Sequence, residues 1–258
     1  MALHMQHAAR GGQRELPLTD AERAARVELA ACYRIFDQLG WTEMIFNHVT
    51  LRVPGPERVF LINPFGLRYD EVCASNLVAV DIEGNPVRPG QAPINRAGFV
   101  THSAIHGSVE GAHCVMHTHT TTGCAVASLE AGLSHDSFYG AQLTGGVAYH
   151  DFEGVTVNPA ERERMLASIG SKKAVILRNH GLLSIGATLP EAFMWLWTLQ
   201  RACDIQIAAA AAGPMRRVPD VVRAQTVREK GPDEAVLCDM VYAALRRKVD
   251  ALDPSYRD

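Results

Sequence analysis

The sequence predicts a mixed α/β domain in which helices cover both faces of a central, mostly antiparallel sheet. Its 258 residues, 47% of them hydrophobic, suit one large domain with a full core or two small ones. Short apolar runs separated by turn residues occur in pairs, as expected for β-hairpins. Longer segments with helical spacing of apolar residues alternate with these pairs, which favours helices packed on both faces of a sheet.

The first half of the chain begins with a helix. The run Thr19-Asp20-Ala21-Glu22 has the capping-box pattern of a helix start, and Gly40 is placed to end that helix. Strands are predicted at residues 48–53, 59–63 and 77–82, because each run is apolar and bounded by proline, glycine or asparagine. Residues 95–109 have helical spacing.

The second half is predicted to contain strands at residues 113–117, 147–149, 174–178 and 182–185. Between them lie a short helix at residues 121–129 and a charged surface helix at 159–169, with Pro159 in its first turn. A long apolar helix over 189–212 ends at Gly213-Pro214. A last helix covers residues 233–250.

Charge and composition exclude several classes of protein. The net charge is −3 with no basic stripe, so nucleic acid is not an expected partner. No apolar run approaches the ~18 residues that a membrane span needs. The first twelve residues lack a hydrophobic signal core and are predicted to belong to a disordered tail. The six cysteines lie in apolar stretches without CxxC spacing, which predicts reduced thiols in a cytoplasmic protein.

Three histidines carry the strongest chemical signal in the chain. His117 and His119 end an apolar run, and their spacing places both on one side of a strand. His180 ends a second apolar run, just before Gly181. Three imidazoles from two strand ends form an open divalent-metal site, with a position left for water or substrate.

Other candidate patterns have simpler explanations. A single buried histidine is more often a hydrogen-bonded core residue than a ligand, but two imidazoles on one strand face have little packing reason to coexist. His102 and His106 share a helix face, yet Ser103 stands where an HExxH site has its glutamate, so we expect them to pack or to support the ligands. Glycine-rich phosphate motifs and GxSxG are absent, so nucleotide binding and a serine nucleophile are not indicated.

Taken together, the motifs resemble the class II aldolase/adducin family. The segments that carry the resemblance are Asn95-Arg-Ala-Gly-Phe-Val-Thr-His-Ser-Ala-Ile-His106, Cys114-Val-Met-His-Thr-His-Thr120 and Ile176-Leu-Arg-Asn-His-Gly181. The resemblance covers about residues 20–212 and implies a three-layer α/β/α fold and a homotetramer with active sites between subunits. It divides the chain into a disordered tail (1–18), a class II aldolase/adducin-type catalytic domain (19–213) and a C-terminal helical extension (214–258).

In the sugar-phosphate aldolases of this family, the matching histidines bind zinc, which implies the same role for His117, His119 and His180. Manganese or iron are alternatives, since both accept imidazole. The metal acts there as a Lewis acid on substrate oxygens and stabilises the enolate formed when a carbon–carbon bond breaks.

The chain departs from those aldolases at three places. Arg96-Ala97-Gly98 replaces a Ser-Ser-Glu turn, which removes the catalytic glutamate and two phosphate-binding serines. Asn47-His48 and Phe65-Gly66 replace two further phosphate-binding turns. A dianionic phosphate needs several aligned donors, so the substrate is predicted to be a small non-phosphorylated molecule. Asn47, Gly66, Gly98 and Arg96 are the predicted substrate-binding positions, with Arg96 either binding a substrate carboxylate or forming a surface ion pair.

Two residues are candidates for proton transfer. Tyr139 follows the paired histidines at about the distance at which family aldolases present a tyrosine to the neighbouring subunit's site. The alternative is a tyrosine of the core or subunit interface. His48 is the second candidate.

Several functions remain open at this stage. The preferred prediction is a metal-dependent lyase that cleaves a carbon–carbon bond of a small hydroxy- or oxo-acid. Some relatives decarboxylate aromatic or oxo acids, and that reaction needs no base to take a hydroxyl proton. A three-histidine site can also hold Fe(II) for an oxygenase. Adducin head domains share the Ile-Leu-Arg-Asn-His-Gly motif yet serve in protein assembly, so a non-catalytic interaction module is a further alternative.

Overall fold

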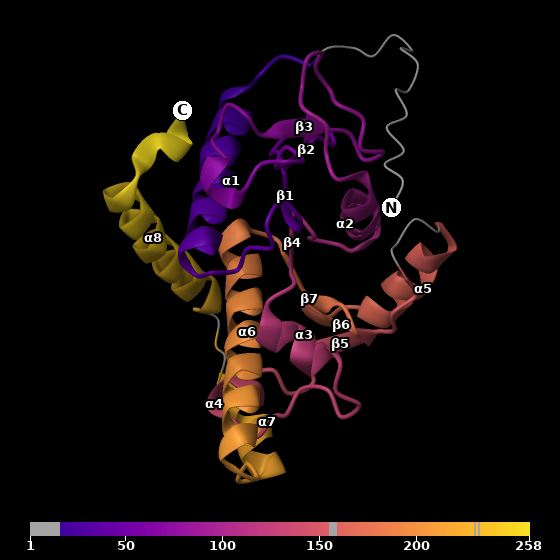
Figure 1. Ribbon diagram of the computed structural model, residues 1–258, viewed down its shortest axis with the longest axis vertical. Helices are drawn as coiled ribbons and strands as arrows, with labels where there is room; N and C mark the ends of the chain where they lie inside the picture. Colours follow the sequence, from indigo (N-terminus) through magenta and orange to yellow (C-terminus); the bar gives the residue numbers. More distant parts are fainter. Residues whose placement is uncertain (1–15, 155–158, 230, 232) are drawn as a thin grey trace.

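A seven-stranded sheet forms the centre of the protein, and helices cover both of its faces (Figure 1). The computed structural model describes residues 16–154, 159–229, 231 and 233–258. The strand order is β3-β2-β1-β4-β7-β6-β5, and every neighbouring pair is antiparallel except β5 and β6. The strands are β1 (His48–Arg52), β2 (Phe60–Ile62), β3 (Val78–Val80), β4 (Cys114–Thr118), β5 (Val147–His150), β6 (Ala174–Leu177) and β7 (Gly181–Gly186). The predicted fold class is confirmed.

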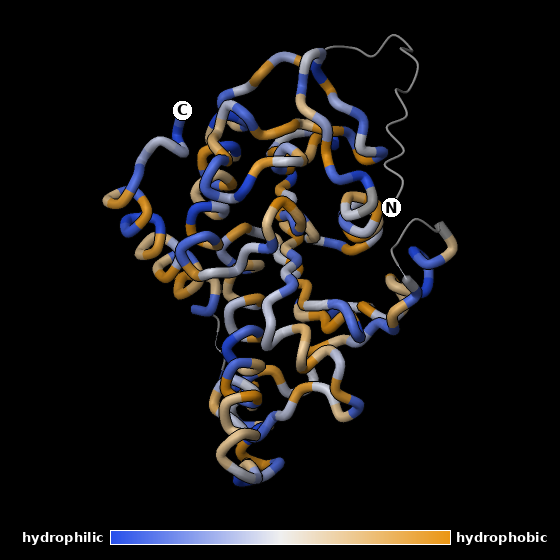
Figure 2. Tube along the Cα trace, in the orientation of Figure 1, coloured by the Kyte–Doolittle hydropathy of each residue, from blue (hydrophilic) through white to orange (hydrophobic). Residues whose placement is uncertain are grey.

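The helices form the two outer layers. They are α1 (Asp20–Gln38), α2 (Arg96–Ser108), α3 (Thr121–Ala127), α4 (Phe138–Gln142), α5 (Pro159–Ile169), α6 (Leu189–Ala212), α7 (Asp220–Glu229) and α8 (Glu234–Leu252), with 3₁₀ turns η1 (Tyr69–Glu71) and η2 (Pro254–Arg257). In Figure 1, α1, α6 and α8 lie on one side of the sheet and α2 and α5 on the other. The larger core cluster lies beneath α1 and α6, and a smaller one lies beneath α2 and α5. Figure 2 shows hydrophobic and hydrophilic turns alternating along α8, as expected for a helix with one face on the core.

The alternation of side chains along the central strands determines which face of the sheet carries polar side chains. Val49 and Leu51 of β1 point into the larger core, so their neighbours His48 and Thr50 point to the α2 side. His48 pairs with His117 across β1 and β4, and Thr50 pairs with Val115. The α2 side of the sheet therefore receives polar side chains from two adjacent strands.

Two helices were not predicted from the sequence. The helix α4 has only five residues, and α7 buries none of its residues, so neither has an apolar stripe that periodicity could detect. The helix at residues 159–169 was predicted to be a surface helix, but Glu161, Met165 and Ile169 are buried. These three residues form the face that packs against β5 and α2, and the other described side chains of α5 are partly or fully exposed, as expected for a surface helix.

The predicted tail and C-terminal extension are both tied to the domain where the structure describes them. Residues 1–15 of the tail lie outside the described residues, whereas the backbone oxygens of Leu16 and Pro17 accept hydrogen bonds from Arg88. In the extension, α8 and η2 pack on α1, and Tyr242, Val249 and Tyr256 belong to the larger core. None of the six cysteines, all of which lie in the described part of the chain, forms a disulfide. None of the described helices has the length and apolarity needed to cross a bilayer.

Candidate metal centre

A cavity of about 470 Å³ is lined by residues of α2 and α5 and by residues at the ends of β4 and β6. Its walls come from the turn before β1, the start of α2, the end of β4, the segment after β5, α5 and the β6–β7 turn. Six of its lining residues are histidines: His48, His102, His117, His119, His150 and His180.

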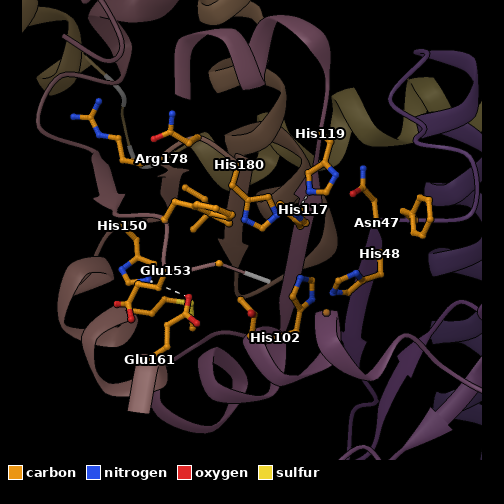
Figure 3. Close-up of a pocket in the computed structure, with 18 of the residues that line it drawn as sticks. Asn47, His48, His102, His117, His119, His150, Glu153, Glu161, Arg178 and His180 are labelled. Atoms are coloured by element: carbon orange, nitrogen blue, oxygen red, sulfur yellow. Dashed lines mark hydrogen bonds and ion pairs between the residues drawn. The ribbon is translucent and has the colours of Figure 1, made fainter. Parts of the chain in front are cut away.

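His117, His119 and His180 converge at one end of this cavity (Figure 3). One nitrogen from each ring can be chosen so that all three lie within 4.8 Å of one another. The Nε2 atoms of His117 and His119 are 2.7 Å apart, and the ring centroids of both lie 4.8 Å from that of His180. The sequence-predicted cluster of three histidines is thus present in the fold.

The surrounding contacts favour the neutral form of these imidazole rings. The Nδ1–H of His117 donates to the backbone oxygen of Leu182 at 2.9 Å, because a carbonyl can only accept. In the neutral ring, Nε2 of His117 is therefore the bare nitrogen that faces the cluster. Burial and the neighbouring imidazoles lower the pKa of His117, and the same causes lower the pKa of His180 to about 4. Rings that stay unprotonated at neutral pH can bind a cation.

The turn between β6 and β7 brings His180 to the other two histidines. Asn179 has φ of 54°, a left-handed conformation that asparagine tolerates better than most residues. A Cβ atom on Gly181 would lie 2.4 Å from the backbone oxygen of Thr118 and 3.0 Å from the His119 ring. Glycine at position 181 is therefore required for β7 to pass this close to the end of β4.

The donor set fits a divalent metal ion such as zinc. Tetrahedral zinc with Zn–N bonds of ~2.0–2.1 Å places its ligand nitrogens about 3.3 Å apart. Side-chain rotations that increase the distance between the Nε2 atoms of His117 and His119, and that bring the His180 ring closer to both, would reach that spacing. The open side of the cavity leaves room for a further ligand.

His48 and His102 extend the histidine cluster along the sheet. Their ring centroids lie 4.1 Å apart, and that of His48 lies 6.2 Å from His117. His48 enters from the first position of β1 and His102 from α2, and both are buried. Asn47, with φ of 65°, turns the chain into β1 and also lines the cavity. Gly98 lies against the His48 ring.

The opposite wall of the cavity was not predicted from the sequence. Nε2 of His150 lies 3.6 Å from a carboxylate oxygen of Glu161, and both side chains are buried. Glu153 accepts a hydrogen bond of 2.7 Å from Nε of Arg164. Only the carboxylates of the charged segment 151–164 could have suggested this wall, and surface helices carry similar charges.

Three of the predicted site residues lie elsewhere in the structure. Arg96 is exposed at the start of α2, and neither it nor Gly66 lines the described cavity. Tyr139 packs edge-on against Trp197 of α6, with ring centroids 5.2 Å apart, and it does not line the cavity either. Of the predicted site residues, Asn47, His48, Gly98 and the three candidate ligand histidines line the cavity of a single chain.

Comparisons with known proteins show which family the chain resembles in sequence and fold. Residues 27–207 match the family model described as "Class II Aldolase and Adducin N-terminal domain". A crystal structure of an aldolase II superfamily protein from Pseudomonas syringae is 42% identical, with a TM-score of 0.87 over 93% of this chain and 98% of that one. The L-fuculose 1-phosphate aldolase from Glaciozyma antarctica PI12 is 29% identical, with a TM-score of 0.81 over 95% of this chain and 98% of that one.

An adducin is among the relatives as well. Alpha-adducin of Rattus norvegicus is 42% identical over 208 residues, which are 79% of this chain but only 28% of that protein. The match to the family model covers most of the chain, and the matched range includes His117, His119 and His180. The protein belongs to the class II aldolase and adducin family.

Proposed function

We propose that the protein is a metal-dependent lyase that cleaves a carbon–carbon bond in a small, non-phosphorylated hydroxy- or oxo-acid. The observation that carries this proposal is the convergence of His117, His119 and His180 at the end of an open cavity. The fold similarity to an L-fuculose 1-phosphate aldolase supports the same class of chemistry.

The three histidines would hold the metal, with zinc expected and manganese or iron(II) as alternatives. When bound, a divalent metal supplies Lewis-acid stabilisation of negative charge that develops on substrate oxygens. The chain itself keeps the imidazoles neutral by burial and orients His117 through the Leu182 carbonyl. A substrate that fills the cavity would replace water around the reacting carbons.

The charges of the cavity argue against a phosphorylated substrate. Among the described lining residues, the basic side chains other than histidine are limited to Arg178. Its Nη1 already donates to the backbone oxygens of Leu129 and Glu130, and its guanidinium lies over the ring of Tyr149. The lining also includes the carboxylates Glu43, Asp151, Glu153 and Glu161. A dianionic phosphate needs several donors, and this wall presents acceptors instead.

Decarboxylation on the same site is the alternative reaction. Gly98 offers no carboxylate, and removal of carbon dioxide needs no base for a hydroxyl proton. The similarity to alpha-adducin favours a second class of function, a non-catalytic interaction module. Metal content and turnover together separate these possibilities.

The test begins with elemental analysis of the purified full-length protein. We expect about one divalent metal per chain, and then release of pyruvate or carbon dioxide in a screen of oxo- and hydroxy-acids. A ketose 1-phosphate that turns over with saturation while its bare sugar is inert would contradict the substrate proposal. Metal-free protein without turnover, even after reconstitution with zinc, manganese or iron(II), would favour the interaction module.

We further propose a homotetramer in which Tyr139 reaches the site of a neighbouring subunit. Its phenol lies on α4, away from the cavity of its own chain. Light scattering measures the assembly directly. In a tetramer of this kind, Tyr139→Phe should lower kcat while leaving the metal content unchanged.

A further inference from the structure

A buried hydrogen-bonded chain runs from α2 to the wall of the cavity. The hydroxyl of Thr50 on β1 lies 2.7 Å from Nδ1 of His102 and 2.7 Å from Nε2 of His106. Nδ1 of His106 lies 2.6 Å from the backbone oxygen of Ala112. The three side chains joined by these hydrogen bonds, Thr50, His102 and His106, are all buried. Of the three, only His102 lines the cavity.

The contacts allow one arrangement of protons. The Ala112 oxygen can only accept, so Nδ1 of His106 carries a proton. Burial lowers the pKa of His106 to about 4, so the ring is neutral at pH 7 and its Nε2 is bare. Thr50 must then donate its single proton to His106, and its oxygen accepts from Nδ1–H of His102.

This arrangement of protons determines the state of Nε2, the second ring nitrogen of His102. His102 is buried, and a neutral imidazole that carries its proton on Nδ1 has a bare Nε2. No described residue forms a hydrogen bond with this atom, although less than 1 Å² of it is exposed. A buried acceptor without a donor is unfavourable, which points to a ligand that supplies one.

His48 supplies the complementary group. Its ring lies beside that of His102 (Figure 3), and neither of its nitrogens has a hydrogen-bond partner among the described residues. The ring is buried, and a neutral imidazole has one N–H donor and one bare nitrogen. The ring occupies its position only because residue 98 is glycine, since a Cβ there would lie 2.1 Å from Cε1 of His48.

We propose that His48 and His102 together bind a hydroxyl group of the substrate, which donates to Nε2 of His102 and accepts the N–H of His48. A hydroxyl is both donor and acceptor, so one oxygen satisfies both unpartnered groups. Thr50 and His106 are positioning residues, because they fix which nitrogen of His102 is bare. The inference rests on the proposed function for its ligand and narrows the substrate to a molecule with a hydroxyl besides the groups that reach the metal.

The proton arrangement can be measured without turnover. In full-length protein labelled with ¹⁵N-histidine, long-range ¹H–¹⁵N spectra separate protonated from bare nitrogens, and a His102→Asn spectrum assigns the signals. We expect a protonated Nδ1 and a bare Nε2 on His102. Thr50→Val, which keeps the shape but removes the hydroxyl, should abolish that preference, whereas the control Thr50→Ser should retain it. A protonated Nε2 in the wild-type protein would overturn the proposal even if Thr50→Val does not fold.

The hydroxyl is tested with two small ketones as probes. Dihydroxyacetone should shift the Nε2 signal of His102 in the metal-loaded wild-type protein, and it should bind roughly tenfold more weakly to Thr50→Val, as expected for one lost hydrogen bond. Hydroxyacetone, which lacks the second hydroxyl, should leave this signal unchanged. Equal shifts with both ketones, or none, would refute the hydroxyl site. Failure of the lyase screen alone would instead refute the proposed reaction, because these shifts require no turnover.

Discussion

At the scale of single residues, the contacts of each imidazole separate the ligand histidines from the others. His117 and His119 point one nitrogen each at a common centre, whereas His106 uses both nitrogens in internal hydrogen bonds. His113 is exposed at the start of the same β4 region. Spacing alone could not make this distinction for His102 and His106, because four-residue spacing on a helix also suits a metal pair.

Replacing one ligand should remove the metal without unfolding the chain. His119 lies just past the end of β4 and is only partly buried, so we expect His119→Ala to fold normally. Two remaining imidazoles bind a divalent metal far more weakly, so elemental analysis should find less than a tenth of the wild-type metal after dialysis. The control His113→Ala changes an exposed histidine nearby and should keep its metal. Full metal content in His119→Ala would refute the assignment of this ligand.

At the scale of the elements, the site depends on how closely strand ends approach. The β6–β7 turn passes over the end of β4, and Gly181 has no side chain to keep the two apart. The other wall depends on α5, which places Glu161 beside His150. Both arrangements join segments that are distant in the sequence.

A methyl group at position 181 should therefore disturb the metal site. The Cβ of Gly181→Ala would meet the Thr118 backbone oxygen at 2.4 Å, and the backbone must move to relieve the overlap. Overpacking of this kind destabilises a protein by about 1–3 kcal/mol. Chemical denaturation and zinc titration should show lower stability and weaker metal binding. Gly107→Ala is the control, since its Cβ would meet nothing closer than 3.8 Å and alanine suits a helix. Unchanged zinc affinity in Gly181→Ala would contradict this account of the turn.

At the scale of the whole molecule, the C-terminal segment completes the core around α1. The backbone oxygens of Tyr256 and Asp258 accept hydrogen bonds from Ala74 and Ser75. Tyr242 of α8 donates to the backbone oxygen of Glu28 on α1. This segment therefore packs against α1 and α6, the helices that cover the sheet on the side away from the cavity.

The buried histidines should make the stability of the metal-free protein fall in acid. His48 and His106 have folded pKa values of about 4, whereas an unfolded histidine titrates near 6.5. Between these pH values the unfolded chain binds more protons than the folded one. The contribution of these histidines to the unfolding free energy is therefore fully present above pH 6.5 and is lost as the pH falls towards 4. Each such histidine contributes a slope of about 1.4 kcal/mol per pH unit in that window.

Urea denaturation at several pH values between 7.5 and 4 measures this slope. His106→Asn should reduce this slope by the amount that one titrating proton contributes, about 1.4 kcal/mol per pH unit. Asparagine can still donate to the Ala112 oxygen but does not titrate. The exposed His113→Ala should leave the slope unchanged. A wild-type unfolding free energy that is flat across the window would show that these rings are not held neutral.

The sequence by itself determined the architecture of the protein, the order of its main elements and the three histidines at the candidate metal centre. These follow from periodicity, from turn residues and from side-chain alternation, which are all local properties of the chain. Only the tertiary structure decided that Thr50, His102 and His106 form one hydrogen-bonded chain beside the His48 ring, that Glu161 is buried near His150, and that Arg96 and Gly66 lie outside the cavity. The physical reason is that a hydrogen bond or a buried charge depends on which segments meet in space, and β1, α2, β4 and α5 meet only when the sheet has formed.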